Sequence, residues 1–578
     1  LGFFFITQSA FAQPCENIYN RSPAVLVHNC SGLKVVRLSG TPRDRAMAFG
    51  ALVRNGTLSP DVLNYFGTKL ERDLAGGLGW LAKPALLAYN QFVRVLHRNV
   101  PIPLAEEIDA MAEGMGVDPI VLRRGLSLAD TGVLVHALGS RFRFLPAMGC
   151  TSVAAQLPDG SFAYGRNLDF AGVGLWDRNP MLLVVEPEAG SSELRHIVIG
   201  ADGLLFGGIT GANEAGITLA VHQNYTSEAG VVGQPLPLIG EFVLRKARTL
   251  DEAVDILRSL RPAVLWTFVL TDLRAEEAIA VESSPSHFLV RRQEGKLFVQ
   301  TNHAMHEESR QIENASFGVK TNSIFRMKQA YELLESGLKS GRKSDLLASV
   351  LAQQEDPEGR FTAYHDILKG LTIQTALFTR GQNREIRLEL SIDPSPTASG
   401  RFASFSLSDL WKNAEPSVEV TDPVRTSPAK RANQRAIAEA FRLYFDEHQY
   451  LKAAQLLESH RTFDAAVLRI VALYEEGRFA ESALESDFAL RDPHFLGEPI
   501  YVRQSVETLR LASLYQLGQK KEALSLAQDL EERYGATGIS ADRLALLVGT
   551  IARGKKPAAW MLDLEFDFFS GDLSGRKN

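Results

Sequence analysis

The stretch LPAMGCTSVAAQLPDGSFAYGRNLDF (residues 145–170) decides the fold, because it places a lone cysteine at the start of a predicted β-hairpin. Two apolar runs, CTSVAAQL and SFAYGRN, flank the dipeptide Asp-Gly, which is typical of a tight hairpin turn. The returning strand carries Arg166 sixteen residues after Cys150 and Asp169 nineteen residues after it. The hairpin is therefore expected to bring both charged side chains back to Cys150.

The bulk composition describes an ordinary globular chain that is long enough for more than one domain. Of its 578 residues, 45% are hydrophobic and 22% are charged, and the formal net charge is −6. The sequence contains no dense Lys/Arg block, so a nucleic-acid surface has little support. No segment after the N-terminus reaches the ~18–20 consecutive apolar residues of a membrane span. We therefore expect no nucleic-acid partner and no stable membrane span.

The N-terminal stretch LGFFFITQSAFAQPC has the form of the end of a secretory signal peptide. Its apolar run leads to Ala-Phe-Ala at 10–12, a small-x-small cleavage signal, so residues 1–12 are predicted to be a signal-peptide remnant. A buried N-terminal strand or helix is the alternative. Export to a periplasm or beyond would let Cys15 and Cys30 form a disulfide, which leaves Cys150 unpaired.

The sequence pattern changes at Cys150. Residues 13–149 are predicted to be a helical prosegment, with helical patterning from residue 34 onwards. One predicted helix face in it consists of Leu104, Ile108, Met111 and Met115. Residues 150–393 then alternate short β-branched runs with helical segments, which predicts an α+β catalytic domain of stacked layers.

The composition changes again after the predicted catalytic domain. Residues 394–432 are rich in Pro, Ser, Thr and Ala, which predicts a linker, and residues 433–578 are helical throughout. Three units in this tail set a Leu-Tyr pair eight or nine residues before an alanine: Tyr444 and Ala453, Tyr474 and Ala483, and Tyr515 and Ala523. These units resemble tetratricopeptide repeats, and a plain helical bundle is the alternative.

A free thiol becomes a nucleophile only when a base or a positive charge stabilises its thiolate. Cys150 lies in no papain-type sequence box, and no downstream histidine has a recognisable context. If the bond between Gly149 and Cys150 is cut, however, the new α-amine can serve as the base. Glycine before the cysteine leaves the preceding carbonyl open to attack by the thiol. The sequence therefore predicts cleavage at Gly149–Cys150.

The residues from about 34 to 392 resemble the cysteine N-terminal-nucleophile (Ntn) hydrolases. This group joins choloylglycine hydrolases, penicillin V acylases, acid ceramidase-like amidases and the autoproteolytic penicillin acyltransferases. Its most specific motif is a cysteine followed by Gly-Arg-Asn-x-Asp, and it is intact here. The segment SGTPRDRAMAFG (39–50) also resembles the start of an acyltransferase-type prosegment, with Ala46 where relatives have Gly. The resemblance implies a four-layer αββα core and self-processing.

The resemblance also implies further catalytic residues. The segment GANEAGITLAVHQNY matches the strand that ends in an oxyanion-hole asparagine, which is Asn224 or its neighbour Gln223. In VQTNHA the matching polar residue is Asn302, and in TNSIFRMKQAYELL the catalytic arginine is Arg326. With Cys150 as nucleophile, Arg166 would favour the thiolate, and Asp169 would bind the new α-ammonium. The expected substrate is a small N-acyl amide with an apolar acyl group, cleaved by hydrolysis or acyl transfer without a cofactor.

Other interpretations stay open at this point. The pair His303 and His306 could suggest a metal site, but no convincing third ligand accompanies them, so we expect no metal. A phospholipase or a peptidase of the same fold is an alternative enzyme. A protein of another class, which binds a partner through its helical repeats on a scaffold that has lost activity, is the alternative to an enzyme.

Overall fold

A computed structural model describes most of the chain. It covers residues 12–555 except 23, 79–81, 138–148, 229, 231–232, 316, 344, 354–365, 413–414, 425, 461–462, 494–499 and 535–540. Further on it describes the strand pair β19 (Leu564–Glu565) and β20 (Ser570–Gly571). Apart from residue 12, the predicted signal-peptide remnant lies outside the described residues. In the part of the chain that is described, no helix combines the length and the apolar character that crossing a membrane requires.

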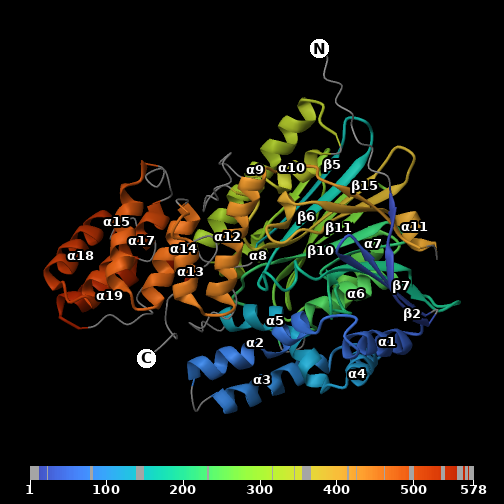
Figure 1. The fold of residues 1–578 in the computed structure, drawn as a ribbon, viewed down its shortest axis with the longest axis horizontal. Helices are drawn as coiled ribbons and strands as arrows, with labels where there is room; N and C mark the ends of the chain where they lie inside the picture. The colour runs from blue at the N-terminus through green and yellow to red at the C-terminus, as the bar shows by residue number, and fades with distance from the viewer. Residues whose placement is uncertain are drawn as a thin grey trace.

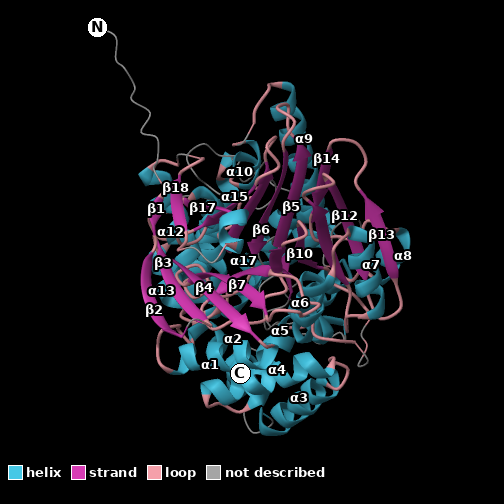
Figure 2. Ribbon diagram, turned by 90° about the vertical axis from the view of Figure 1, so that its right-hand side faces the viewer, coloured by secondary structure: helices cyan, strands magenta, loops and turns pink. Residues whose placement is uncertain are grey.

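Two large β-sheets form the centre of the molecule (Figure 2). In spatial order the first contains β1 (Gln13–Pro14), β18 (Ser417–Thr421), β17 (Phe402–Ser406), β16 (Ile386–Ser391), β15 (Thr372–Arg380), β6 (Phe162–Asp169), β5 (Gly149–Gln156) and β14 (Leu297–Gln300). The second contains β13 (Phe288–Arg292), β12 (Glu277–Ser283), β11 (Trp266–Asp272), β10 (Ile217–Gln223), β9 (Thr210–Asn213), β8 (His196–Ala201), β7 (Pro180–Pro187), β4 (Leu33–Gly40), β3 (Val25–Cys30) and β2 (Glu16–Ser22).

The inner faces of the two sheets share one apolar core. Phe162 and Tyr164 of β6 pack there with Leu182 of β7 and Ile197 of β8. Because side chains alternate along a strand, the neighbouring residues of β5 and β6 face the other way. Strand order and burial therefore give each sheet one face toward its partner sheet and one toward helices.

Helices cover the outer faces of both sheets. The eight-stranded sheet packs against α9 (Phe317–Lys339) and α10 (Leu346–Leu351), in the upper part of Figure 1. The ten-stranded sheet packs against α1 (Pro42–Arg54), α4 (Ile102–Met115), α6 (Leu236–Lys246) and α7 (Leu250–Ser259). Further helices before the tail are α2 (Asp61–Leu78), α3 (Ala82–His97), α5 (Pro119–Ala137), α8 (Glu307–Ile312), α11 (Leu407–Trp411) and the 3₁₀ turn η2 (Thr397–Ser399). The α+β class predicted from the sequence is confirmed.

Of the segment predicted as a helical prosegment, 13–149, the described residues from 42 to 137 are mainly helical, and residues 138–148 lie outside the described residues. Residues 13–40 form the strands β1 to β4, and β4 runs parallel to β7 with Val36 opposite Leu183. The run LKVVRL is rich in β-branched and apolar residues, and pairing with β7 buries it. The face of α4 expected from Leu104, Ile108, Met111 and Met115 is buried. The N-terminal segment is therefore part of the central sheets as well as a helical cover.

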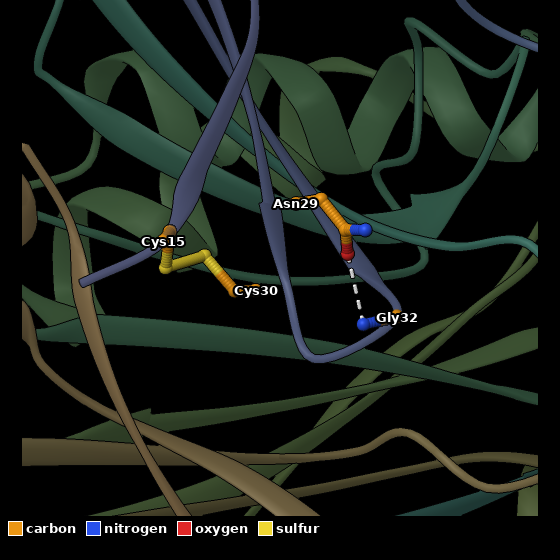
Figure 3. Close-up of a disulfide and its surroundings, with 4 residues drawn as sticks. All are labelled: Cys15, Asn29, Cys30 and Gly32. Carbon is orange, nitrogen blue, oxygen red and sulfur yellow. Dashed lines mark hydrogen bonds between the residues drawn. A yellow bond between two sulfur atoms is a disulfide. The ribbon is translucent and has the colours of Figure 1, made fainter. Parts of the chain in front are cut away.

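A disulfide bond joins Cys15 to Cys30 beside the turn between β3 and β4 (Figure 3). In that turn the backbone N–H of Gly32 donates to Asn29 Oδ1 at 2.9 Å. Cys150 is buried and free.

The linker predicted at 394–432 is wrong. Two of its runs form β17 and β18, and these strands extend the eight-stranded sheet beyond β16. The Pro- and Ser-rich pieces are the connections around these strands. The catalytic unit predicted as 150–393 therefore extends to about residue 421.

The described part of the tail is mainly helical, and its helices lie to the left in Figure 1, but the prediction that it is helical throughout is wrong, because β19 and β20 form a short strand pair within it. Its helices are α12 (Pro428–Phe445), α13 (Tyr450–Leu456), α14 (Phe463–Glu475), α15 (Phe479–Arg491), α17 (Ile500–Gln516), α18 (Lys520–Tyr534) and α19 (Ala541–Ala552). The three alanines of the predicted repeat units are buried between them: Ala453, Ala483 and Ala523. The assignment to tetratricopeptide repeats stays a prediction.

Candidate active site

The site is built on the β5–β6 hairpin predicted from the sequence. The two strands pair antiparallel, with Gly149 opposite Asp169 and Ser152 opposite Arg166. The glycine next to Arg166 is required by close packing, because a Cβ at Gly165 would lie 2.6 Å from a methyl carbon of Leu377. Residues that are distant in sequence thus meet at the start of β5.

Arg166 reaches the predicted nucleophile, Cys150, directly. Its Nη2 donates to Cys150 Sγ at 3.2 Å, and both side chains are almost completely buried. The guanidinium also donates to the carbonyl oxygens of Ile209 at 2.5 Å and Val221 at 2.8 Å. Val221 belongs to β10 of the opposite sheet and Ile209 directly precedes β9, so Arg166 bridges the sheets and its position beside the thiol is fixed.

Burial dominates the protonation of the thiol. It raises the pKa of Cys150, while the charge of Arg166 lowers it and that of Asp169 raises it. The expected effect of Arg166 is therefore present, but burial outweighs it in the uncut chain. A protonated thiol at neutral pH needs a proton acceptor before it can attack a carbonyl.

Asp169 lies against the predicted cleavage point. A Cβ at residue 149 would lie 2.8 Å from Asp169 Oδ2, which explains why glycine stands there. The other oxygen, Oδ1, accepts a hydrogen bond from Thr372 Oγ1 at 2.7 Å. Within the described residues Oδ2 has no hydrogen-bond partner. Burial raises the pKa of Asp169 to about 6, against the charge of Arg326.

Asn302 and Arg326 hold the backbone of Cys150. The N–H of Cys150 donates to Asn302 Oδ1 at 2.6 Å, and Arg326 Nη1 donates to the Cys150 carbonyl oxygen at 2.8 Å. Arg326 Nη2 also donates to Asn302 Oδ1 at 3.0 Å, and its Nε donates to Asn322 Oδ1. The structure therefore brings Arg326 to Cys150.

The two candidates for the oxyanion hole differ in the atom they leave available. Thr267 Oγ1 donates to Asn224 Oδ1 at 2.8 Å, so the buried Nδ2 donor is left without a partner among the described residues. For Gln223 the unpartnered atom is the acceptor Oε1, and this side chain lines the pocket beside Cys150. An oxyanion needs a donor: Asn224 offers its unpartnered Nδ2, whereas Gln223 lines the pocket and Asn224 is not among the lining residues, so both residues stay candidates.

An apolar pocket ends at Cys150. Its few polar wall residues include Asp169 and Gln223, and the other lining side chains are almost all apolar. Part of the wall comes from the segment before the nucleophile, through α2, α4 and α5. Those residues include Leu63, Phe66, Met111, Leu122 and Leu126. Such a pocket suits an apolar group on the reacting carbonyl.

The two histidines considered for a metal have other surroundings. His303 Nδ1 lies 2.9 Å from Ser323 Oγ, and burial lowers its pKa to about 4. His306 stands at the N-cap of α8. Among the described residues no group of three or more His, Cys, Asp or Glu is arranged to hold a metal ion.

Several residues of the site carry no signal in the sequence. Thr372 holds Asp169, and Thr267 holds Asn224, but a threonine in a strand is ordinary. The pocket wall from α2 and α5 looks like any amphipathic helix. Met111, on the face of α4 predicted as core, is buried as expected and also lines the pocket.

Comparisons with known proteins agree with the motif. Residues 156–390 match the model of the family described as acyl-coenzyme A:6-aminopenicillanic acid acyl-transferase, which is less than half of the chain. This match confirms the resemblance to penicillin acyltransferases and their relatives that the sequence predicts. No curated protein matches the chain.

Two solved structures are similar over part of the chain. One is an N-acylethanolamine-hydrolyzing acid amidase ortholog from Caenorhabditis elegans, with 16% identity and a TM-score of 0.29. The similar region covers 39% of this chain and 92% of the amidase chain. The other is a variant of a conjugated bile acid hydrolase from Clostridium perfringens, with 11% identity and a TM-score of 0.27 over 48% of this chain and 94% of that chain.

Proposed function

We propose that this protein is an exported, self-processing cysteine amidohydrolase or acyltransferase of the Ntn type. It would cleave amides that carry an apolar acyl group. The observation that carries the proposal is the contact between Arg166 and Cys150 Sγ, at 3.2 Å, at the end of an apolar pocket. The family match to an acyltransferase supports the same reaction class. The Cys15–Cys30 disulfide supports export, because such bonds persist in oxidising compartments.

Self-processing would begin with attack of Cys150 Sγ on the carbonyl carbon of Gly149. A C–S bond forms, the C–N bond breaks, and the thiol proton ends on the released α-amine of Cys150. Water then hydrolyses the thioester, which releases the Gly149 carboxylate and restores the thiol. Asp169, whose Oδ2 faces Gly149, is placed to bind the new α-ammonium.

In the processed enzyme the α-amine of Cys150 would act as general base and then as general acid. Asn302 and Asn224 would supply the side-chain donors of the oxyanion hole. The acyl group would occupy the apolar pocket while the amine leaves. The acyl-enzyme would then pass its acyl group to water or to another amine.

Intact-mass analysis tests the processing step. The purified protein should contain a fragment that begins at Cys150 and ends at residue 578, whereas Cys150→Ala should remain uncut with an unchanged unfolding midpoint. An uncut wild-type chain that hydrolyses amides would refute self-processing. An uncut chain without activity would favour the alternative of a binding protein.

A second experiment tests the substrate class and the oxyanion assignment. N-acyl p-nitroanilides from butanoyl to dodecanoyl, compared with peptide p-nitroanilides, should show a preference for the longer N-acyl compounds. Asn302→Ala and Asn224→Ala should each lower kcat by roughly 100-fold or more, because one oxyanion donor contributes about 3 kcal/mol. Gln223→Ala should lower it far less. Equal losses for Gln223→Ala and Asn224→Ala would overturn the choice between them, and efficient peptide cleavage would indicate a peptidase.

A further inference from the structure

One wall of the apolar pocket is the loop between β6 and β7. Phe170 and Trp176 of this loop line the pocket together with Phe66 of α2. Phe66 contacts both other rings, with centroids 5.6 Å apart for Phe66 and Phe170 and 6.1 Å apart for Phe66 and Trp176. The position of this aromatic cluster therefore sets the width of the pocket.

The Trp176 end of the loop is fixed within the catalytic unit. Asp177 Oδ1 accepts the N–H of Gly174 at 2.5 Å, and Oδ2 accepts the N–H of Ser395 at 2.7 Å.

The Gly172 end is held by the tail. Asp446, the C-cap residue of α12, accepts a hydrogen bond from the Tyr65 hydroxyl, and the backbone N–H of Gly172 acts to lower the pKa of the same carboxyl against its burial. Tyr65 directly precedes Phe66 in α2, and the two rings pack edge to face at 5.0 Å. Lys69, one turn further along α2, is 1% exposed and supplies a positive charge near the carboxylate. One tail carboxylate thus joins two parts of the aromatic cluster.

Other residues of α12 contact the same region. A Cβ at Gly174 would lie 2.8 Å from Arg442 Cδ, so the arginine chain packs directly on the loop. A Cβ at Gly370 would lie 2.9 Å from the ring of Phe441. Gly370 is two residues before Thr372, which holds Asp169. Figure 1 shows α12 where the tail meets the rest of the molecule.

We propose that α12 of the tail is a functional wall support of the acyl pocket, and that Asp446 is a positioning residue that sets selectivity for acyl-chain length. The proposal rests on the proposed function, because it takes the pocket as the acyl site. Loss of Asp446 frees Tyr65 and the Gly172 backbone together, so the ring cluster loses its fixed spacing. Long acyl chains contact this cluster and short ones do not. The reacting groups at Cys150 have no contact with Asp446.

The test compares four full-length variants: Asp446→Ala, Asp446→Asn, Tyr65→Phe and the control Asp529→Ala. Asp529 is a half-exposed tail carboxylate on α18 that pairs with Arg533, and α18 lies at the far end of the tail in Figure 1. For Asp446→Ala we expect KM for decanoyl p-nitroanilide to rise ~10-fold, with kcat for the butanoyl compound changed less than ~2-fold. Tyr65→Phe should raise the same KM by a smaller factor. Asp446→Asn, which keeps an acceptor oxygen, should raise this KM less than Tyr65→Phe does.

Hydrogen exchange of the uncut Cys150→Ala protein provides a readout that needs no activity. Adding Asp446→Ala should speed exchange in residues 170–178 and in α2 at least ~5-fold, and adding Asp529→Ala should not. Unchanged exchange there, or an equal rise in KM for short and long acyl chains, would overturn the proposal. Faster exchange in a protein without amidase activity would refute the proposed function and leave the coupling between tail and pocket intact.

Discussion

The segment before Cys150 and the helical tail both pack on the same catalytic unit, but they are attached to it in different ways. The N-terminal segment joins it through backbone pairing, since β4 extends the ten-stranded sheet beside β7. Buried ion pairs reinforce this attachment. Arg245 of α6 donates to both carboxylate oxygens of Glu107 on α4, at 2.5 and 2.9 Å. Arg45 of α1 pairs with Glu193 at 2.7 Å.

The tail, in contrast, is attached mainly through one helix face. Ile437, Phe441 and Tyr444 of α12 enter the apolar cluster that also contains Cys150, and the later tail helices pack on one another. A buried hydrogen bond from Ser399 Oγ to Gln434 Oε1, at 2.8 Å, adds to this contact. The segment that self-processing would cut away is therefore built into the fold, while most of the tail is an addition to it.

Truncation should give the largest contrast between the two regions. Residues 150–578 produced alone should not fold, because β7 loses β4 and keeps only β8, and the core of the ten-stranded sheet loses the apolar side chains of α1, α4 and α5. A chain that ends at residue 460 keeps α12 and α13 and should process itself within ~3-fold of the full-length rate, since the missing helices touch no site residue. A chain that ends at residue 426 should lose processing or solubility. Soluble, active 150–578 would show that the N-terminal segment is only a removable cover.

This contrast also shows what the sequence could predict. The β5–β6 hairpin is encoded locally by an Asp-Gly turn between two apolar runs, so the approach of Arg166 and Asp169 to Cys150 follows from nearby residues. Asn302 and Arg326 lie more than 150 residues away, and only the resemblance to a family could connect them to the nucleophile. Their individual roles stay predictions.

The misplaced boundaries have one physical cause. Residues 13–40 and the pair β17 and β18 become strands because distant partners bury them, and short runs of this kind carry weak local signals. The Pro- and Ser-rich composition around β17 is typical of turns as well as of linkers. The sequence pattern therefore could not predict the domain boundaries that depend on pairing with distant strands.

The buried ion pairs of the N-terminal segment should contribute more to stability than exposed ones on the same helix. Glu107→Ala removes the bidentate partner of Arg245 and should lower the free energy of unfolding by about 3 kcal/mol, because two buried hydrogen bonds to a charged group are lost, although Glu241 and Glu193 still pair with Arg245. Glu113, also on α4, pairs with Arg43, and both of those side chains are 60% exposed. Glu113→Ala should cost less than about 1 kcal/mol in urea unfolding. If both variants lose the same free energy of unfolding, the N-terminal segment is attached through backbone pairing and not through buried ion pairs.

The smallest predicted effect is a pH dependence of the N-terminal attachment. Asp130 of α5 accepts hydrogen bonds from Trp266 Nε1 at 2.9 Å and from the N–H of Leu236 at 3.0 Å, so it links the segment before the cut to the unit after it. Burial raises the pKa of Asp130 from 3.8 to about 7. A carboxyl with a raised pKa in the folded state binds its proton more tightly there than in the unfolded chain.

The stability associated with this proton is therefore complete below about pH 4 and is lost as the pH rises through about 7. Between pH 4.5 and 8 we expect a loss of roughly 2 kcal/mol that Asp130→Asn should remove, because an amide does not titrate. Asp169, whose pKa is also raised, to about 6, titrates in both proteins, so the difference between wild type and Asp130→Asn isolates Asp130. Urea unfolding at the two pH values measures it. If the variant loses as much stability as wild type, Asp130 is not the group that makes the attachment of the N-terminal segment sensitive to pH.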